Sequence, residues 1–202
     1  TTIGDSNIAI GYNAMFGDAG LQNDNNIAIG SENAAGSVLA AMGGQWTSNR
    51  CEQNIAIGTG SLAGAMNDSH NNIAIGYVAL GALTTGDNNT VIGSLAGDAM
   101  TDNAGNVIIG KSAFSVADAG ENYNVVIGGD AGTAINNGSA DYNVLIGQDA
   151  GTGGTGAMAS CIAIGGNAMN STGTNAQTGT VAIGHDALTT LTSGAGNTAV
   201  GY

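Results

Sequence analysis

The feature that most constrains this chain is a five-residue motif, Asn-[Ile/Val/Thr]-x-Ile-Gly, which recurs eleven times with small variations. Four copies read NIAIG, and from Gly58 to Gly201 successive motif glycines lie 17 to 19 residues apart. A short period of this kind is typical of solenoids, in which each repeat packs only against its neighbours. The sequence therefore predicts a single repeat domain over residues 1–202 rather than a globular fold.

The structural positions of the repeat are its leading Asn, its Ile and its closing Gly. In the first eight copies these are Asn7, Ile10 and Gly11; Asn26, Ile29 and Gly30; Asn54, Ile57 and Gly58; Asn72, Ile75 and Gly76; Asn89, Ile92 and Gly93; Asn106, Ile109 and Gly110; Asn124, Ile127 and Gly128; and Asn143, Ile146 and Gly147. We expect the stacked Asn side chains to form amide ladders. We expect each closing Gly to turn a corner in a conformation that disfavours a Cβ.

The residues between the motif Asn and Gly are apolar on both faces of the strand that they predict. Side chains two residues apart point to the same face, and the residue between them points the other way. The middle position is apolar in all eleven full copies. One face can fill the inside of a coil, and the other needs a second surface, for which we expect another copy of the chain. The sequence predicts an all-β parallel β-solenoid of about eleven coils of 17–19 residues.

The remainder of each repeat predicts a return segment and turns. Ala stands three residues after the motif Gly in eight of ten copies, which predicts a tightly packed second segment. Asn, Asp, Ser, Thr and Gly supply turn residues elsewhere. A helical return over Tyr77–Leu83 is the alternative. The residue directly after the motif Gly varies among Tyr, Ser, Lys, Gln and His, so we expect it to face solvent.

Composition excludes several classes of function. Proline is absent, which suits a backbone committed to strand pairing. The chain has fifteen acidic residues and only two basic ones, Arg50 and Lys111, for a net charge of −13. Binding to nucleic acid or to an anionic membrane surface is therefore not expected. No run of apolar residues is long enough to span a bilayer, so we expect no membrane insertion. Because no signal peptide precedes the repeats, we expect a fragment of a longer protein or a processed product.

Several local patterns resemble catalytic or metal sites without their context. Residues Gly105–Ser112 match the P-loop expression, but the residues between the glycines belong to the repeat's own strand. Gly151–Gly156 matches a dinucleotide fingerprint without a following helix. His70 and His185 have no histidine partner at ligand spacing. We expect these segments to be ordinary parts of the repeat.

Acidic residues raise two further possibilities. Asp130, Asp149 and Asp186 each stand two residues after a motif Gly, so they could form a column that binds Ca²⁺ weakly, although a solvated stripe is favoured. A polysaccharide depolymerase, the alternative from the enzyme class, would need carboxylates paired across a cleft. The acidic residues here lie in loops without that context. We therefore predict no catalytic residue, no cofactor and no metal site, and we expect that the chain is not an enzyme.

One irregularity interrupts the repeat, because Gly30 and Gly58 are 28 residues apart. The extra residues predict a surface insertion at about 31–53, which contains Trp46 and Arg50. These two side chains are candidates for contact with a receptor, because an exposed Trp can stack on a sugar. A Trp that covers the edge of a coil is the alternative. Cys51 and Cys161 are six motif steps apart, so we expect free thiols, with Cys161 replacing a ladder Asn.

The NxAIG-x-x-A pattern resembles the head repeats of YadA-like trimeric autotransporter adhesins, and still more the NTAIGY-type repeats of bacteriophage tail fibres. The resemblance runs from Asn7 to Tyr202. It implies a left-handed β-roll, three chains intertwined or packed as a homotrimer, and an extracellular fibre on a virion or a cell surface. The implied partners are the chain itself and a cell-surface glycan or protein receptor. YadA-like heads have shorter coils, so the extra residues here are expected in bulges or a longer return.

The function predicted from the sequence is therefore that of a structural or adhesive fibre segment, most similar to a bacteriophage tail fibre involved in host-cell attachment. A bacterial trimeric adhesin or another extracellular filament subunit is the alternative in the same class. An ice-binding solenoid is disfavoured, because regular Thr-x-Thr columns are lacking.

Overall fold

The computed structural model describes residues 4–15, 23–30, 41–42, 50–154, 156–173 and 175–202. In this part of the chain the regular elements are all strands, two or three residues long. They are β1 (Ile8–Ile10), β2 (Ile27–Ile29), β3 (Ile55–Ile57), β4 (Ile73–Ile75), β5 (Thr90–Ile92), β6 (Val107–Ile109), β7 (Val125–Ile127), β8 (Val144–Ile146), β9 (Met158–Ala159), β10 (Ile162–Ile164), β11 (Gln177–Thr178), β12 (Val181–Ile183) and β13 (Thr198–Val200).

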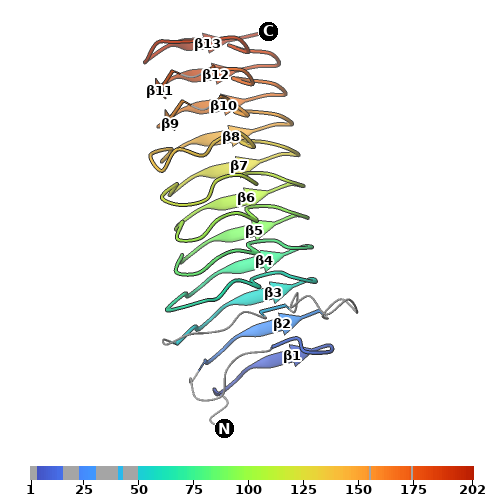
Figure 1. Cartoon of the computed structure of the whole chain (residues 1–202). Helices are drawn as coiled ribbons and strands as arrows, with labels where there is room; N and C mark the ends of the chain where they lie inside the picture. The colour runs from blue at the N-terminus through green and yellow to red at the C-terminus, as the bar shows by residue number, and fades with distance from the viewer. Residues whose placement is uncertain (1–3, 16–22, 31–40, 43–49, 155, 174) are drawn as a thin grey trace.

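The eleven motif strands form one parallel sheet in the order β1-β2-β3-β4-β5-β6-β7-β8-β10-β12-β13, so each coil adds one strand beside the previous one (Figure 1). The register is in step throughout, and Ile55, for example, pairs with Ile73. The short β9 and β11 pair separately. The all-β parallel solenoid is therefore confirmed. Residues 77–82 form turns, so the helical alternative for the return segment is wrong.

The motif glycines stand in a tight column at one corner of the coil. Gly76, Gly93 and Gly110 have φ values of +141°, +148° and +144°, a region that L side chains rarely adopt. A Cβ on Gly110 would lie 2.2 Å from the carbonyl oxygen of Gly128 in the next coil. Glycine is thus required both by the backbone conformation and by the close contact between successive coils.

The return segment after each motif Gly is held by hydrogen bonds to neighbouring coils rather than by a helix. The Leu80 N–H donates to the Ala96 carbonyl (3.1 Å), while the Val78 N–H donates to the Thr59 carbonyl of the coil before (2.9 Å). Leu80 and Val78 both have positive φ, 51° and 55°, and the Ala79 between them is fully buried. The predicted small-residue return segment is therefore present, with left-handed residues on both sides of its buried Ala.

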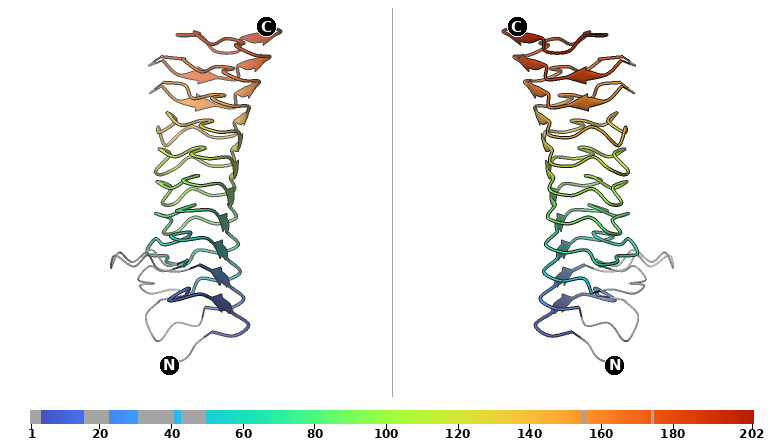
Figure 2. Two further views of the ribbon diagram at one scale, coloured as in Figure 1. Left: turned by 90° about the vertical axis from the view of Figure 1, so that its right-hand side faces the viewer. Right: turned by 90° about the vertical axis from the view of Figure 1, so that its left-hand side faces the viewer.

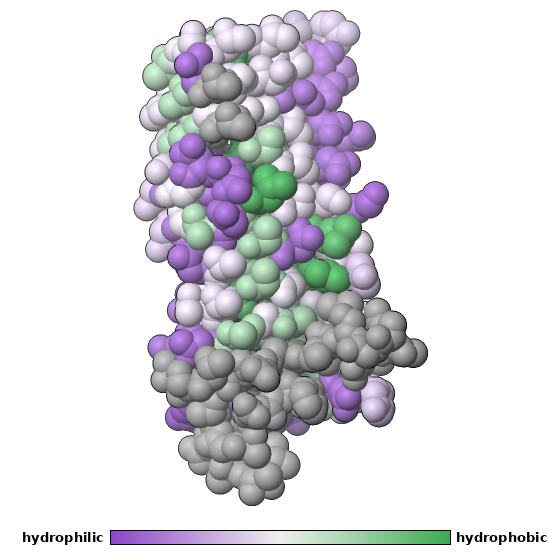
Figure 3. All heavy atoms as spheres, viewed as in Figure 1, coloured by the Kyte–Doolittle hydropathy of each residue, from purple (hydrophilic) through white to green (hydrophobic). Residues whose placement is uncertain are grey.

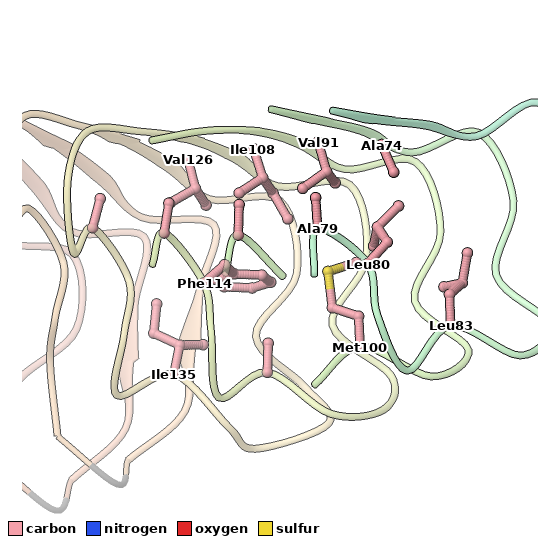
Figure 4. Close-up of a cluster of buried hydrophobic side chains, with 14 of the residues drawn as sticks. Ala74, Ala79, Leu80, Leu83, Val91, Met100, Ile108, Phe114, Val126 and Ile135 are labelled. Carbon is pink, nitrogen blue, oxygen red and sulfur yellow. The ribbon is translucent and has the colours of Figure 1, made fainter. Parts of the chain in front are cut away.

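The core of the solenoid is formed inside the coil by the middle residues of the motif strands from β2 to β12 and by two or three residues of most return segments. Figure 4 shows Ala74, Val91, Ile108 and Val126 in one row, facing return-segment residues that include Phe114. These side chains are fully buried. Because a coil is so narrow, each layer of this core contains only a few side chains, and their volumes must match.

Residue sizes compensate within each layer. Where the strand supplies Ala74, the return segment supplies Leu80, and where the strand supplies Leu145, the equivalent return position is Gly151. A Cβ on Gly151 would lie 2.6 Å from Leu145 Cδ2. The other layers pair Ala56 with Leu62, Val91 with Gly97, Ile108 with Phe114, Val126 with Gly132, Ala163 with Met169 and Ala182 with Leu188. Among these described layers, only the Ile108 layer contains two large residues at these positions, and there a third core position is the small Ala117.

Candidate functional site: an exposed apolar ladder

The outer face of the long sheet carries two parallel columns of side chains, which we call the apolar ladder. Its members are the first and third residues of every motif strand. The first column is Ile8, Ile27, Ile55, Ile73, Thr90, Val107, Val125, Val144, Ile162, Val181 and Thr198, and the second is Ile10, Ile29, Ile57, Ile75, Ile92, Ile109, Ile127, Ile146, Ile164, Ile183 and Val200. The ladder contains no charged residue.

The ladder is partly exposed within the single chain, most of all in the terminal strands. Ile109 is 36% exposed and Ile10 is 57% exposed, whereas the middle residue Ile108 is fully buried. At about 4.8 Å per strand, ten strand steps make the ladder roughly 48 Å long. With a width of roughly 10 Å, the ladder presents on the order of 500 Å² of contiguous apolar surface, as large as the largest patches on ordinary monomers. A surface of this size indicates an interaction site.

Polar residues border the ladder on both sides. The column that follows the motif glycines includes the exposed Lys111 and Gln148, and the column that precedes the motif Asn includes the exposed Asn71 and Asn88. The sheet forms one straight edge in the side views of Figure 2, on the far side of the view in Figure 1. On the opposite face, where described residues are visible, the strongly hydrophobic ones lie in small separate patches (Figure 3). An apolar centre with a polar rim is the usual composition of a protein–protein interface.

A buried amide ladder beside the sheet keeps these strands in register. Each Asn Oδ1 accepts a hydrogen bond from the backbone N–H of the leading motif residue in the next coil, as from Asn72 to Asn54 (2.9 Å) and from Asn89 to Asn72 (3.0 Å). Side-chain amides also bond directly, as Asn143 Nδ2 does to Asn124 Oδ1 (2.9 Å). The Asn column therefore fixes the height of each motif strand, and with it the spacing of the outward Ile side chains.

A second polar column, two residues before the motif Asn, was not anticipated from the sequence. Its side chains accept hydrogen bonds in the opposite sense, from the preceding coil. Asp87 Oδ1 accepts the His70 N–H (2.6 Å), and Asp141 Oδ1 accepts the Asn122 N–H (2.6 Å). His70 takes part through Nδ1, which accepts the Glu52 N–H (3.2 Å). The signal that could have revealed this column is the recurrence of Asp, Asn or His at that one offset.

Glu121 is a buried carboxylate that the sequence analysis also missed. Its side chain is fully buried, and its oxygens accept hydrogen bonds from Asn103 Nδ2 (2.8 Å) and from the backbone N–H groups of Asn137 (2.9 Å) and Gly138 (2.6 Å). Hydrogen bonds to the ionised form offset the cost of removing a carboxylate from water. Glu121 therefore connects the loop around Gly138 to the coil below.

The predicted receptor contact is only partly within the described residues. Trp46 lies outside them, as does most of the insertion at 31–53. Arg50 is described, and its side chain is half exposed. Its guanidinium pairs with Asp24 and with Glu52 Oε1 (2.7 Å), one residue from the coil before and one from its own coil. The structure thus gives Arg50 a role between two coils, whatever contact the insertion makes.

Both cysteines are buried free thiols, as expected from their separation along the solenoid. The backbone N–H of Cys161 donates to Asn143 Oδ1 (2.9 Å), so Cys161 takes the position of a ladder Asn. Burial raises the pKa of both thiols. A thiol kept neutral and buried is a poor nucleophile, so neither cysteine has the environment of a reactive residue.

The remaining sequence patterns fall on ordinary repeat geometry. The residues between Gly105 and Gly110 include β6, with turns after it, and residues 151–154 are turns and loop before β9. Asp149 accepts from Gln148 Nε2 (3.2 Å), and Asp186 accepts from Asn167 Nδ2 (2.9 Å). Within the described ranges, no group of three His, Cys, Asp or Glu side chains could hold a metal ion. The same part of the chain contains no helix long and apolar enough to cross a membrane.

The apolar ladder, regular in spacing and uncharged, is the candidate contact surface in the described part of the chain. Comparison of the chain with protein-family models, curated proteins and solved structures finds no match.

Proposed function

We propose that this chain is a structural or adhesive segment of an extracellular fibre, in which copies of the chain associate along their length through the apolar ladder as a homotrimer. The observation that carries the proposal is the ladder itself, with Ile in ten of the eleven positions of its second column. The hydrophobic effect opposes leaving so much apolar surface in water.

The area of the ladder is consistent with association. Two facing ladders of on the order of 500 Å² each would bury roughly 1,000 Å² in total, near the lower end for specific interfaces. A chain that contacts two neighbours around a common axis covers more of its apolar surface than a chain that contacts one. This favours a trimer over a dimer.

The resemblance to NTAIGY-type repeats supports a bacteriophage tail fibre that contributes to host-cell attachment. A bacterial trimeric adhesin or another extracellular filament subunit shares the same ladder and is the second candidate. The two differ in the domains that they require elsewhere, a virion-attachment domain in the first and a membrane anchor in the second. The proposal includes no catalytic activity, since most of the described acidic residues serve as hydrogen-bond acceptors or stand in exposed loops.

Oligomeric state tests the role of the ladder. Ile109 and Val116 belong to the same coil and are similarly exposed, 36% and 40%, but only Ile109 is on the ladder. In light scattering coupled to size exclusion, the native chain and the Val116→Glu control should both have the mass of a trimer. Ile109→Glu combined with Ile127→Glu should shift the mass towards a monomer, because the introduced carboxylates would be desolvated against each other. A native chain that is monomeric at all concentrations would refute the proposal.

The adhesive part of the proposal rests on the insertion at 31–53. There the structure favours replacing Trp46 alone over replacing Trp46 and Arg50 together. Because Arg50 pairs with Asp24 and Glu52, replacing it would disturb contacts between coils as well as any receptor contact. Trp46→Ala is the cleaner change. It should weaken binding to host cells or cell-surface glycans in a pull-down assay while the trimer mass stays the same. Unchanged binding would remove Trp46 from the contact.

A further inference from the structure

Two exposed tyrosines occupy the same position in successive coils. Tyr123 and Tyr142 each stand directly before a motif Asn, with φ of 58° and 60°. Their backbone N–H groups donate to the coil before, that of Tyr123 to the Ala104 carbonyl (3.0 Å) and that of Tyr142 to the Asn122 carbonyl (3.2 Å). The two side chains therefore leave the solenoid at equivalent points, one coil apart, and point the same way.

The two rings lie face to face. Their centroids are 5.3 Å apart and their planes differ by only 8°. Below them the equivalent position is Gly105, where a Cβ would lie 2.6 Å from Tyr123 Cδ1, so the Tyr123 ring rests over a residue with no side chain. Tyr123 is 56% exposed and Tyr142 is 62% exposed. The pair is thus held in register by the backbone while its outer edge stays open to solvent.

We propose that Tyr123 and Tyr142 are a site of oxidative modification, at which the two phenols couple into an intrachain dityrosine that joins the coil of β7 to the coil of β8. Each phenol loses one electron and one proton to give a phenoxyl radical. The radicals form a carbon–carbon bond between the ring positions ortho to their hydroxyls, and both rings regain aromaticity by shifting the ortho hydrogens to oxygen. The oxidant is a peroxide acting through a peroxidase, and the two electrons and two protons reduce one hydrogen peroxide to two waters.

The stacked geometry favours this pair over random encounters. For parallel rings that leave equivalent points in the same direction, equivalent atoms are about as far apart as the ring centres, so the reacting carbons start near one another. The coupling then needs only a tilt of two exposed rings. The other three tyrosines lack such a partner in the described part of the chain. Tyr12 and Tyr77 are several coils apart, and Tyr202 stacks on His185 (centroids 5.7 Å apart).

The test is limited oxidation of the purified protein with a haem peroxidase and hydrogen peroxide, followed by dityrosine fluorescence, a denaturing gel and peptide mapping. A protease that cleaves before Asp separates the two residues into peptides 118–129 and 141–148. We expect a linked species with the summed mass of these peptides less two hydrogen atoms, in a chain of unchanged size on the gel. Tyr142→Phe should lose the fluorescence and the linked peptide. Tyr77→Phe, which removes a tyrosine of similar exposure, should keep both.

The outcomes separate the proposal from general oxidation. Fluorescence that persists in Tyr142→Phe would overturn it, as would a product in which the chains are linked only to one another. Oxidised tyrosine in peptides 118–129 and 141–148 without the linked species would overturn it as well. Because Phe can keep the stack, a failure of Tyr142→Phe to fold is not expected, and a far-UV circular dichroism spectrum that matches that of the native chain checks that it has folded.

Discussion

The compensation of volumes inside each coil can be tested by converting a layer with a large strand residue and a return Gly into a layer with a small strand residue and a large return residue. Leu145 is fully buried opposite Gly151, whereas Ala74 lies opposite Leu80. The double variant Leu145→Ala with Gly151→Leu would give the first layer the composition of the second. The backbone permits this, because Gly151 (φ +59°) and Leu80 (φ 51°) share the same left-handed conformation.

Each single change should be costly. Leu145→Ala empties a closed layer, and such truncations cost about 2–5 kcal/mol of unfolding free energy. Gly151→Leu places a Cβ 2.6 Å from Leu145 Cδ2, and overpacking costs about 1–3 kcal/mol. A left-handed non-glycine residue adds about 1–2 kcal/mol. The two singles together should therefore sum to about 6 kcal/mol, taking about 3 kcal/mol for each.

The double variant should cost far less than that sum. It removes the clash and fills the cavity, so that the left-handed Leu, at about 1–2 kcal/mol, is the main cost that remains. The coupling energy should therefore reach about 4–5 kcal/mol, above the roughly 3 kcal/mol that is the usual upper end for residues in contact. The measurement is urea unfolding followed by far-UV circular dichroism at one protein concentration, since association would contribute to apparent stability.

A matched control combines Leu145→Ala with Gly97→Leu. Gly97 has the same backbone role, but a Cβ there meets Met100 Sδ (2.7 Å) and not Leu145. Those two changes should be additive. Additive effects for Leu145 with Gly151 would show that the coil adjusts to each change separately, and the argument from matched volumes would be wrong.

Three further predictions concern the column of motif glycines, the amide ladder and a partly buried carboxyl group. Gly110→Ala should cost about 3 kcal/mol or more in urea unfolding, because its Cβ would meet the next coil, whereas Gly129→Ala, with open space around its Cβ, should change little. Cys161→Asn should stabilise by about 1 kcal/mol in the same assay, because its Oδ1 could accept the Thr180 N–H; a loss would mean that the thiol fits better there. Burial raises the pKa of Asp98, so the folded chain binds this proton more tightly than the unfolded chain does. The free energy of unfolding therefore falls as pH rises from the ordinary pKa of Asp towards the raised one. Asp98→Asn should remove this fall, measured as melting temperature between acidic and neutral pH, and an unchanged profile would contradict the prediction.

How much could be predicted from the sequence depended on how local the cause was. The motif Gly was predictable because a positive φ and a close contact both require it, and the Asn column because identical polar residues one coil apart can bond. The acceptor column around Asp87 and Asp141 was not predicted, because Asp, Asn and His alternate there and no single residue type repeats. The buried Glu121 was missed because its three donors come from segments 16 to 18 residues away in either direction.

The sequence by itself determined the repeat and the parallel stacking of its strands, and it showed that the strands are apolar on both faces. These follow from a period of 17 to 19 residues and from the composition of the motif. Only the tertiary structure decided which face lies inside. The middle residue turns inward, where its volume is matched against the return segment, so it varies from Ala74 to Leu145 while the outward Ile of the second column hardly varies. Alternation alone cannot distinguish two apolar faces, because the choice depends on how the coil closes.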